Sequence, residues 1–198
     1  MKGVFAEILD KKLGSFYNNQ AEVERIIEEM MKKATRNITI HSPKFGHFYS
    51  YSVGEILYNK VLNNRNVTIL TNEKVEGDKK GSIDKLAEEG IVFFGGILSG
   101  SAKDRYFLNE LSENLNFYFT INPFETDSEL VIVDQSIALT NDRNGSFRGY
   151  IKENCKYLDK KYLRAVNEVI SGEMAYKIDT IKLLKKAKEA REKSAILV

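Results

Sequence analysis

The stretch TDSELVIVDQSIALTNDRN, from Thr126 to Asn144, predicts a β-hairpin with polar side chains at its start and its end. The apolar run LVIV is followed by Asp134-Gln135, which suits a tight turn, and then by a second strand-like run, SIAL. Asp127 and Glu129 open the first strand, where side chains two residues apart share one face. The hairpin therefore starts with two carboxylates side by side and ends in the polar corner Asn-Asp-Arg-Asn.

Predicted strands and helices alternate along the chain before this hairpin. Short apolar runs predict strands at 37–43, 66–72, 91–98 and 116–121. Apolar stripes at helical spacing predict helices at 18–34, 53–64, 82–89 and 103–115. Alternation of this kind implies parallel strand pairing, with the helices packed on the sheet. The hairpin adds antiparallel strands, so the predicted sheet is mixed.

The predicted fold class is α/β: a mixed, mainly parallel β-sheet flanked by helices, with a C-terminal helical extension. After the hairpin, residues 147–170 predict one more strand and a closing helix. We expect one domain over residues 1–171, including an N-terminal arm or helix, and a basic helix over residues 172–198. A chain of 198 residues has room for one full hydrophobic core.

Composition indicates a folded protein that does not cross a membrane. The 42% apolar and 29% charged residues are typical of a globular domain. No apolar run approaches the roughly 20 residues that span a bilayer, and acidic residues in the first segment argue against a secretory signal. The single Cys155 excludes an internal disulfide and suits a reducing compartment. We therefore expect a cytoplasmic protein with no membrane partner.

The polar residues of the hairpin resemble, in their spacing, the motif of the phospholipase D superfamily. That motif is His-x-Lys, four residues, Asp, six residues and Gly-Ser-x-Asn. On DSELVIVDQSIALTNDRN, Asp127 takes the His position and Glu129 the Lys position, whereas Asp134 and Asn144 match. The resemblance extends, as an order of elements, over roughly residues 20–170 and implies a phospholipase D-like fold.

The substitutions in this motif remove the groups that perform the superfamily's chemistry. In the superfamily the His attacks the phosphodiester and the Lys neutralises the phosphate oxygens. Two carboxylates about 4–6 Å from a phosphate would instead repel it by about 3–4 kcal/mol each at an effective dielectric near 20. We therefore expect a degenerate site with no catalytic residues, no phosphodiesterase activity and no cofactor.

Three interpretations of the two carboxylates remain open at the level of sequence. Asp127 and Glu129 can be a solvated start of the hairpin. With Asp142 they can bind a divalent metal, because hard cations prefer carboxylate oxygens. They can also recognise a cationic or hydroxyl-rich ligand. No metal ligand is assigned, and the carboxylates are kept as candidate ligand-binding residues.

A second polar and aromatic group, HSPKFGHFYSYS (41–52), leaves the first predicted strand. Ligands of open α/β sheets bind at the carboxyl ends of parallel strands, where this loop begins. Rings with hydroxyls and a basic group can bind a sugar or a base, or can pack in the core instead. The predicted ligand-binding residues of loop and hairpin together are His41, Ser42, Lys44, His47, Tyr49, Asp127, Glu129, Asp142 and Asn144.

The chain also resembles the effector domains of TrmB-type archaeal transcriptional regulators, which are degenerate phospholipase D-like domains that bind sugars. That resemblance implies a non-catalytic module that binds a sugar-like molecule and acts in transcription regulation, although no winged helix is expected at the N-terminus. The alternatives are a phosphodiesterase, nuclease or metal-dependent hydrolase that uses other residues, and an assembly protein that docks a partner. Single-motif members of the superfamily pair across a two-fold axis, so we expect a homodimer.

The C-terminal stretch KIDTIKLLKKAKEAREK (177–193) predicts a basic helix. Its Lys185, Lys186, Lys188 and Arg191 can contact an acidic partner protein or a phosphate backbone, or can form a solvated face. The net charge of the whole chain is +2, too small for its entire surface to bind nucleic acid. A nucleic-acid contact would therefore be local to this helix.

Overall fold

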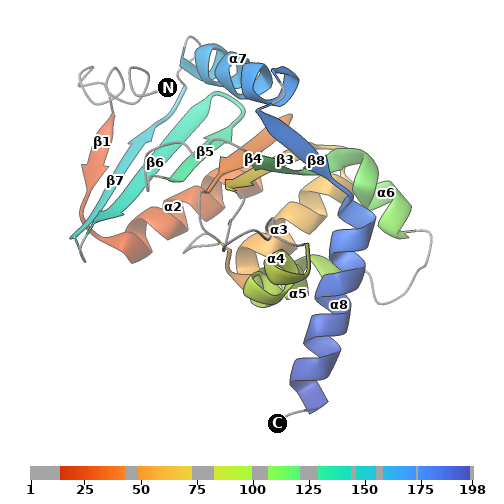
Figure 1. Cartoon of the computed structure of the whole chain (residues 1–198). Coiled ribbons are helices and arrows are strands. Elements are labelled where there is room, and N and C mark those ends of the chain that lie inside the picture. Colours follow the sequence, from red (N-terminus) through yellow and green to blue (C-terminus); the bar gives the residue numbers. More distant parts are fainter. Residues whose placement is uncertain are drawn as a thin grey trace.

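The structure, a computed structural model, describes residues 14–42, 49–72, 83–99, 107–120, 129–143, 146–154, 158–172 and 174–196. The predicted N-terminal arm falls on residues 1–13 and lies outside them. The described residues form one eight-stranded mixed sheet with helices on both faces (Figure 1). The α/β architecture predicted from the alternation of strands and helices is confirmed.

The strand order of the sheet is β1-β7-β6-β5-β2-β3-β4-β8. The strands are β1 (Ser15–Tyr17), β2 (Asn37–His41), β3 (Asn66–Asn72), β4 (Leu115–Thr120), β5 (Glu129–Val133), β6 (Ser136–Arg143), β7 (Ser146–Lys152) and β8 (Ala175–Ile178). Among the described pairings, β2–β3 and β3–β4 are parallel and the other five are antiparallel. Parallel pairing is therefore confined to the centre, a smaller share than expected, because β5 and β8 both run against it.

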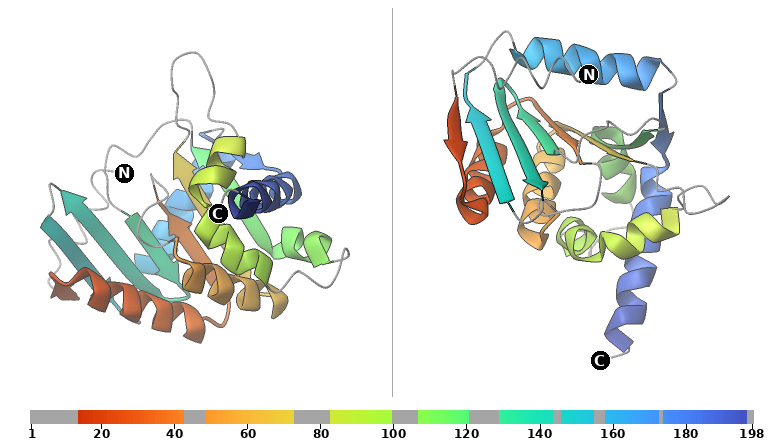
Figure 2. Two further views of the ribbon diagram at one scale, coloured as in Figure 1. Left: turned by 90° about the horizontal axis from the view of Figure 1, so that it is seen from below. Right: turned by 60° about the vertical axis from the view of Figure 1, so that its left-hand side comes forward.

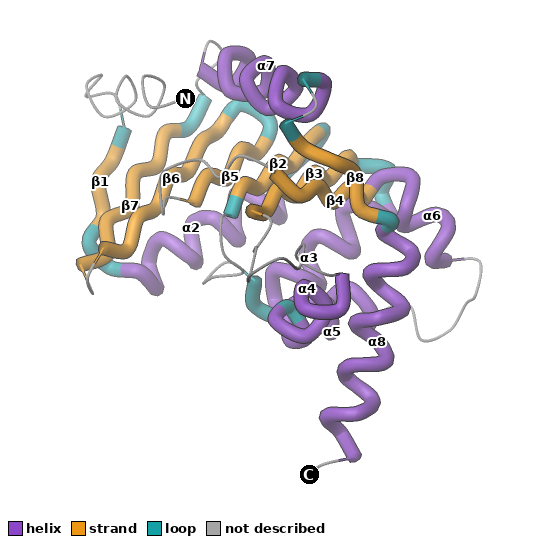
Figure 3. Tube along the Cα trace, in the orientation of Figure 1, coloured by secondary structure: helices purple, strands orange, loops and turns teal. Residues whose placement is uncertain are grey.

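The helices divide unequally between the two faces of the sheet. They are α2 (Gln20–Lys33), α3 (Tyr51–Leu62), α4 (Ile83–Glu89), α5 (Ile91–Ser99), α6 (Phe107–Asn114), α7 (Leu158–Ser171) and α8 (Thr180–Ile196). Helix α7 lies on one face, which we call the minor face, and the others lie on the opposite, major face (Figures 1 and 2). The tube in Figure 3 shows the same layers. Helix α2 begins as predicted, with the Asn19 side chain accepting a hydrogen bond from the N–H of Glu22 at 3.2 Å.

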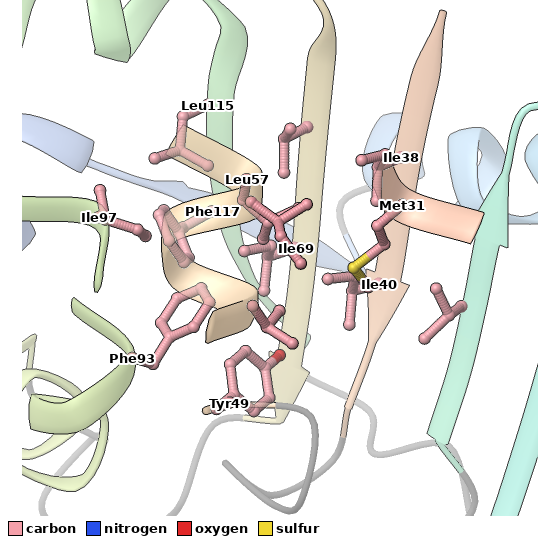
Figure 4. Packing of buried hydrophobic residues seen from close by; sticks show 14 of the residues in the cluster. Met31, Ile38, Ile40, Tyr49, Leu57, Ile69, Phe93, Ile97, Leu115 and Phe117 are labelled. Atoms are coloured by element: carbon pink, nitrogen blue, oxygen red, sulfur yellow. The ribbon is translucent and has the colours of Figure 1, made fainter. Parts of the chain in front are cut away.

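Strand alternation sorts the core onto the two faces. Ile38, Ile40 and Ile69 point to the major face and pack against helices α2, α3 and α5 (Figure 4). Leu70 and Leu130 point to the minor face, where α7 contributes apolar side chains. Because both faces of the central strands are covered, most of their residues are buried, including polar ones such as Thr39 and Thr71. Further polar side chains, His41, Asn72 and Thr120, lie at the last positions of β2, β3 and β4.

The segment IVFFGGILS, predicted as the third strand, is helix α5 instead. Its Phe93, Phe94 and Ile97 are fully buried. A short run that is apolar on every side has no period that distinguishes a buried strand from a buried helix, so the strand prediction was wrong for a physical reason. The third parallel strand is β4, which follows α6.

Two glycines let α5 cross α3 in direct backbone contact. A β-carbon on Gly54 would lie 2.1 Å from the carbonyl oxygen of Phe93, and one on Gly96 would lie 2.1 Å from the carbonyl oxygen of Tyr51. Neither distance leaves room for a methyl group. Gly54 and Gly96 therefore form the closest part of the interface between α3 and α5.

Residues 172–198, expected as a basic helix, contain a strand as well. Strand β8 pairs antiparallel with β4, and the hydroxyl of Thr180 at the start of α8 donates to the carbonyl oxygen of Leu115 at 3.0 Å. Helix α8 then buries Leu183, Leu184 and Ala187 against the major-face helices. None of the described helices is both long and apolar enough to cross a bilayer.

Asp134 occupies the predicted turn between β5 and β6, with a positive φ of 50°. Its carboxylate accepts hydrogen bonds from the N–H and the hydroxyl of Thr35 at 2.7 and 2.8 Å. It also accepts from the N–H groups of Arg36 at 2.8 Å and Asn37 at 2.9 Å. Although burial by itself raises the pKa of Asp134, these hydrogen bonds outweigh it and hold the pKa below its usual value. The motif aspartate therefore joins the hairpin to the start of β2.

We expect Asp134→Asn to lower the free energy of unfolding by about 2 kcal/mol at pH 7, since hydrogen bonds to a charged acceptor are worth about 1.5–3 kcal/mol. Asparagine tolerates the positive φ, so the turn itself is retained. The folded-state pKa is lowered, so the carboxylate's contribution is present above its unfolded pKa of 3.8 and is lost as the pH falls below that value. Urea denaturation at pH 7 and pH 3 measures both effects. Equal loss at the two pH values would contradict the assignment.

Candidate functional site

One edge of the sheet brings together the polar side chains at the ends of several central strands. Strands β2, β3 and β4 are parallel, so their carboxyl ends lie together, at His41, Asn72 and Thr120. Strand β5 is antiparallel to β2, so its first residue, Glu129, lies at the same edge. The predicted meeting of the β2 end with the hairpin start is therefore present, and we call this region the carboxyl edge.

On the major face of the carboxyl edge, Ser42, Tyr49 and Glu129 form one polar cluster. The Ser42 hydroxyl donates a hydrogen bond to Oε1 of Glu129 at 2.5 Å. Ser42 is fully buried and Glu129 is 9% exposed, so the cluster is shielded from bulk water. The Ser42 N–H donates to the carbonyl oxygen of Leu70 at 2.9 Å, which holds the residue against β3.

Tyr49 joins this cluster to the hydrophobic core. Its ring meets that of Phe93 edge-on, with ring centres 4.9 Å apart (Figure 4). Burial raises the pKa of the Tyr49 hydroxyl far above its ordinary value, the negative charge of Glu129 raises it further, and hydrogen bonding with Ser42 offsets part of the rise. Tyr49 is therefore a neutral phenol that can exchange hydrogen bonds with a ligand but cannot act as a phenolate.

The minor face of the same edge carries a different cluster, His41, Asn72 and Thr120. His41 pairs with Leu130 across the strands, and Leu130 belongs to the minor-face core. The Thr120 hydroxyl lies 2.8 Å from Oδ1 of Asn72 and donates to it. Burial lowers the pKa of His41 from 6.5 to about 3, and hydrogen bonding with Asn72 offsets only part of that shift. His41 is therefore neutral at physiological pH and supplies no positive charge.

The predicted single site is thus divided by the sheet, as far as its residues are described. Ser42, Tyr49 and Glu129 come together on the major face, whereas strand alternation turns His41 to the minor face. The predicted residues Lys44, His47, Asp127 and Asn144 lie outside the described part of the chain, and Asp142 lies in β6 with its side chain undescribed.

Asn72 and Thr120 belong to the carboxyl edge but were not among the predicted ligand-binding residues. Both are polar residues at or next to the last position of a predicted strand, and this was the available signal. Strand ends in parallel sheets are where ligand contacts arise, so the same argument that selected His41 also applied to them. Thr140 is a further buried polar residue, opposite Glu129 in the β5–β6 pairing.

Within the described residues, no group of three or more His, Cys, Asp or Glu side chains is placed to hold a metal ion. Of the metal set Asp127, Glu129 and Asp142, the side chain of Glu129 is the one described, and it bonds to Ser42. A serine hydroxyl that donates to this carboxylate competes with a cation for the same oxygen. The described chemistry of the edge is therefore that of a carboxylate surrounded by hydroxyls and amides.

The order of strands, the antiparallel hairpin beside the parallel centre and the division of the helices define a phospholipase D-like fold. No protein-family model matches the chain, and no curated protein matches it by sequence. Solved structures share its fold at low sequence identity, and such a likeness shows the fold alone.

Among them is the phospholipase D family member Nuc from Salmonella typhimurium, with a TM-score of 0.54 and 12% identity over 83% of this chain and 98% of that one. TrmBL2, an archaeal chromatin protein, has a TM-score of 0.52 and 12% sequence identity, and the match covers 89% of this chain and 62% of TrmBL2. Phosphatidylserine synthase from Haemophilus influenzae has a TM-score of 0.55 and 13% sequence identity, and the match covers 93% of this chain and 44% of the synthase. The resemblance inferred from the hairpin motif is thus confirmed at the level of the fold.

Proposed function

We propose that this protein is a non-catalytic phospholipase D-like module that binds a hydroxyl-rich, sugar-like small molecule at the carboxyl edge. The observation that carries the proposal is the buried carboxylate of Glu129, which stands at the lysine position of the superfamily motif and bonds to Ser42. A carboxylate at this position repels the phosphate that a lysine would attract. Carboxylate, phenol and hydroxyl groups together suit the alternating donors and acceptors of a sugar.

A regulatory role is the setting that best fits such a module. TrmBL2 is an archaeal chromatin protein with a novel mode of DNA binding, and its fold is similar to that of this chain. A ligand-binding site without catalysis is useful where occupancy itself is the signal. We also propose that the module is a homodimer, which light scattering of the purified chain would test.

Binding of neutral mono- and disaccharides, followed by thermal shift, tests the ligand site directly. A sugar present at about 100 times its Kd is expected to add roughly 2.7 kcal/mol to the free energy of unfolding. Glu129→Gln retains the side-chain volume but removes the charge, and we expect it to weaken binding at least about tenfold, in keeping with roughly 1.5–3 kcal/mol for a charged hydrogen bond. Inorganic phosphate is expected to produce no shift.

Glu113→Gln is a matched control, because Glu113 is an exposed residue of α6 and lies away from the carboxyl edge. It should bind the same sugar as the unaltered protein. If no sugar of the panel stabilises the protein, or if Glu113→Gln and Glu129→Gln weaken binding equally, the proposed function fails.

One arrangement favours a hydrolase as the second candidate. A serine hydroxyl that donates to a carboxylate is the relation between a nucleophile and its general base. Ser42 and Glu129 have this relation at 2.5 Å, but the charge of Glu129 repels the phosphodiester that Ser42 would attack. Release of nitrophenol from bis-(p-nitrophenyl) phosphate, abolished by Ser42→Ala, would replace the binding assignment with a hydrolase. No release is the expected result.

A further inference from the structure

Helix α8 is the most basic element of the described protein, and its second half stands apart from the body. It carries six basic and two acidic side chains. Outside α8 the chain has 24 basic and 26 acidic residues, so the positive balance of the protein resides in this helix. Figure 1 shows the C-terminal half of α8 extending away from the sheet and the other helices, and Figure 2 shows the same from a second direction.

Four of the basic side chains form a row along α8. Lys182, Lys185, Lys188 and Arg191 recur at every third residue, and all four are exposed. Residues three apart are neighbours on a helix surface, but each step turns the direction back by about 60°, so the basic row passes about halfway around α8 between Lys182 and Arg191. At a rise of 1.5 Å per residue it spans roughly 13 Å, the axial rise of about four nucleotides of one strand.

Two acidic side chains of α8 adjoin the basic row, because Glu189 lies four residues after Lys185 and Glu192 lies four residues after Lys188. Lys186 lies outside the row, and its Nζ is 3.1 Å from Oδ1 of Asp84 in α4. The same Nζ is 3.6 Å from Oε2 of Glu189, which turns this carboxylate toward Lys186. The Lys186–Asp84 pair links α8 to α4 at the surface, while the buried side chains of Leu183, Leu184 and Ala187 hold the helix in position.

An exposed aromatic ring lies at the last position of the basic row. A β-carbon placed on Gly95 would be 3.6 Å from Cδ2 of Tyr51 and 3.8 Å from Nη1 of Arg191, so ring and guanidinium are neighbours over α5. Tyr51 is 42% exposed and is the first residue of α3. A ring beside a guanidinium is a combination that accepts a nucleobase by stacking and its phosphate by charge.

We propose that the basic row of α8 and Tyr51 bind single-stranded nucleic acid, with the phosphates along the row and a base stacked on Tyr51. Regular cationic spacing matches a backbone of regularly repeated phosphates. The exposed ring favours an unpaired base, because bases in a duplex are already stacked. This surface is formed by α8, α5 and the start of α3, and it does not depend on the sugar site at Glu129.

Fluorescence anisotropy with a labelled oligothymidine of about 20 nucleotides, longer than a typical binding site, tests the proposal. Lys182→Glu/Lys185→Glu/Lys188→Glu should weaken binding at least about tenfold. It should also flatten the dependence of log K on log salt by roughly 2, since each phosphate contact of a single strand contributes about 0.7. Tyr51→Ala should weaken binding about tenfold and leave the salt dependence unchanged.

The matched control reverses three charges elsewhere. Arg25, Lys32 and Lys33 are exposed on α2, away from α8, and Arg25→Glu/Lys32→Glu/Lys33→Glu gives the same net charge as the α8 variant. It should retain most of the affinity, and thermal melting verifies that each variant is folded. Glu129→Gln should bind the oligonucleotide normally, which separates this proposal from the sugar site.

Three outcomes would overturn the proposal. The first is an equal loss of affinity in the α2 and α8 variants, which would show a response to net charge alone. The second is tighter binding of a duplex of the same length, unaffected by Tyr51→Ala. The third is binding to anionic phospholipid vesicles with no binding to the oligonucleotide.

Discussion

Replacing Gly96 with alanine is expected to remove at least about 3 kcal/mol from the free energy of unfolding. The new β-carbon would lie 2.1 Å from the carbonyl oxygen of Tyr51 and 2.8 Å from the nitrogen of Glu55. Both atoms belong to the backbone of α3, so neither can rotate away, and the two helices must separate. Overpacking commonly costs 1–3 kcal/mol, and a clash with rigid backbone belongs at or above the upper end of that range.

Gly54→Ala should be equally damaging from the other side of the crossing, because its β-carbon would meet the carbonyl oxygen of Phe93 at 2.1 Å. Against a total stability of about 5–15 kcal/mol, such losses bring the protein close to unfolding at ambient temperature. Urea denaturation followed by circular dichroism measures both variants.

Gly95→Ala is the matched control for this prediction, since Gly95 adjoins Gly96 in the same helix. Its β-carbon would approach the Tyr51 ring no closer than 3.6 Å, an ordinary contact. Alanine favours a helix over glycine by about 1 kcal/mol, so this variant should be unchanged or slightly more stable. A loss comparable to that of Gly96→Ala would show that the crossing does not require its glycines.

The second large effect is a loss of stability at acidic pH. Burial lowers the pKa of His41 to about 3, whereas the unfolded chain has the ordinary value of 6.5. Below pH 6.5 the unfolded state takes up a proton that the folded state does not bind until near pH 3, so acid favours unfolding. The free energy of unfolding should therefore fall by about 1.4 kcal/mol for each pH unit between pH 6 and pH 4.

His41→Gln should flatten this dependence, because glutamine does not titrate. Its stability at pH 7 is expected to be lower than that of the unaltered chain, and the difference should shrink as the pH falls toward 4. Denaturant midpoints at half-unit steps above pH 4.5 isolate His41, since the contribution of Asp134 is lost below about pH 4. Parallel curves for the two proteins would contradict a buried neutral histidine.

Local sequence patterns predicted the helices and strands that have one apolar side and one polar side. Helix α2 has one apolar stripe and an Asn19 cap, and the β5–β6 hairpin has an Asp134 turn between apolar runs, so both were predicted close to their observed bounds. Helix α5 was predicted wrongly because its apolar residues surround the whole segment. Its glycines acquire meaning only beside α3, which lies about forty residues away in the sequence.

The same distinction applies to the candidate site. The sequence predicted that the end of β2 and the start of the hairpin would hold polar side chains, but it placed His41 and Glu129 in one ligand-binding site. Ser42 and His41 are adjacent in sequence and turn to opposite faces, since a strand reverses its side chains at every residue. The register of β2 with β5, in which Ile40 lies opposite Val131 and His41 opposite Leu130, determined which residues surround each side chain.

By itself the sequence determined the α/β class and the positions of most helices and strands. These properties depend on residue type and on periods of two to four residues, which neighbouring residues are sufficient to define. Tertiary structure decided that α5 is a helix, that the central parallel strands are enclosed by antiparallel ones, and that Glu129 meets Ser42 while His41 faces away. Those outcomes depend on contacts between residues distant in the sequence, where packing and strand register outweigh local preference.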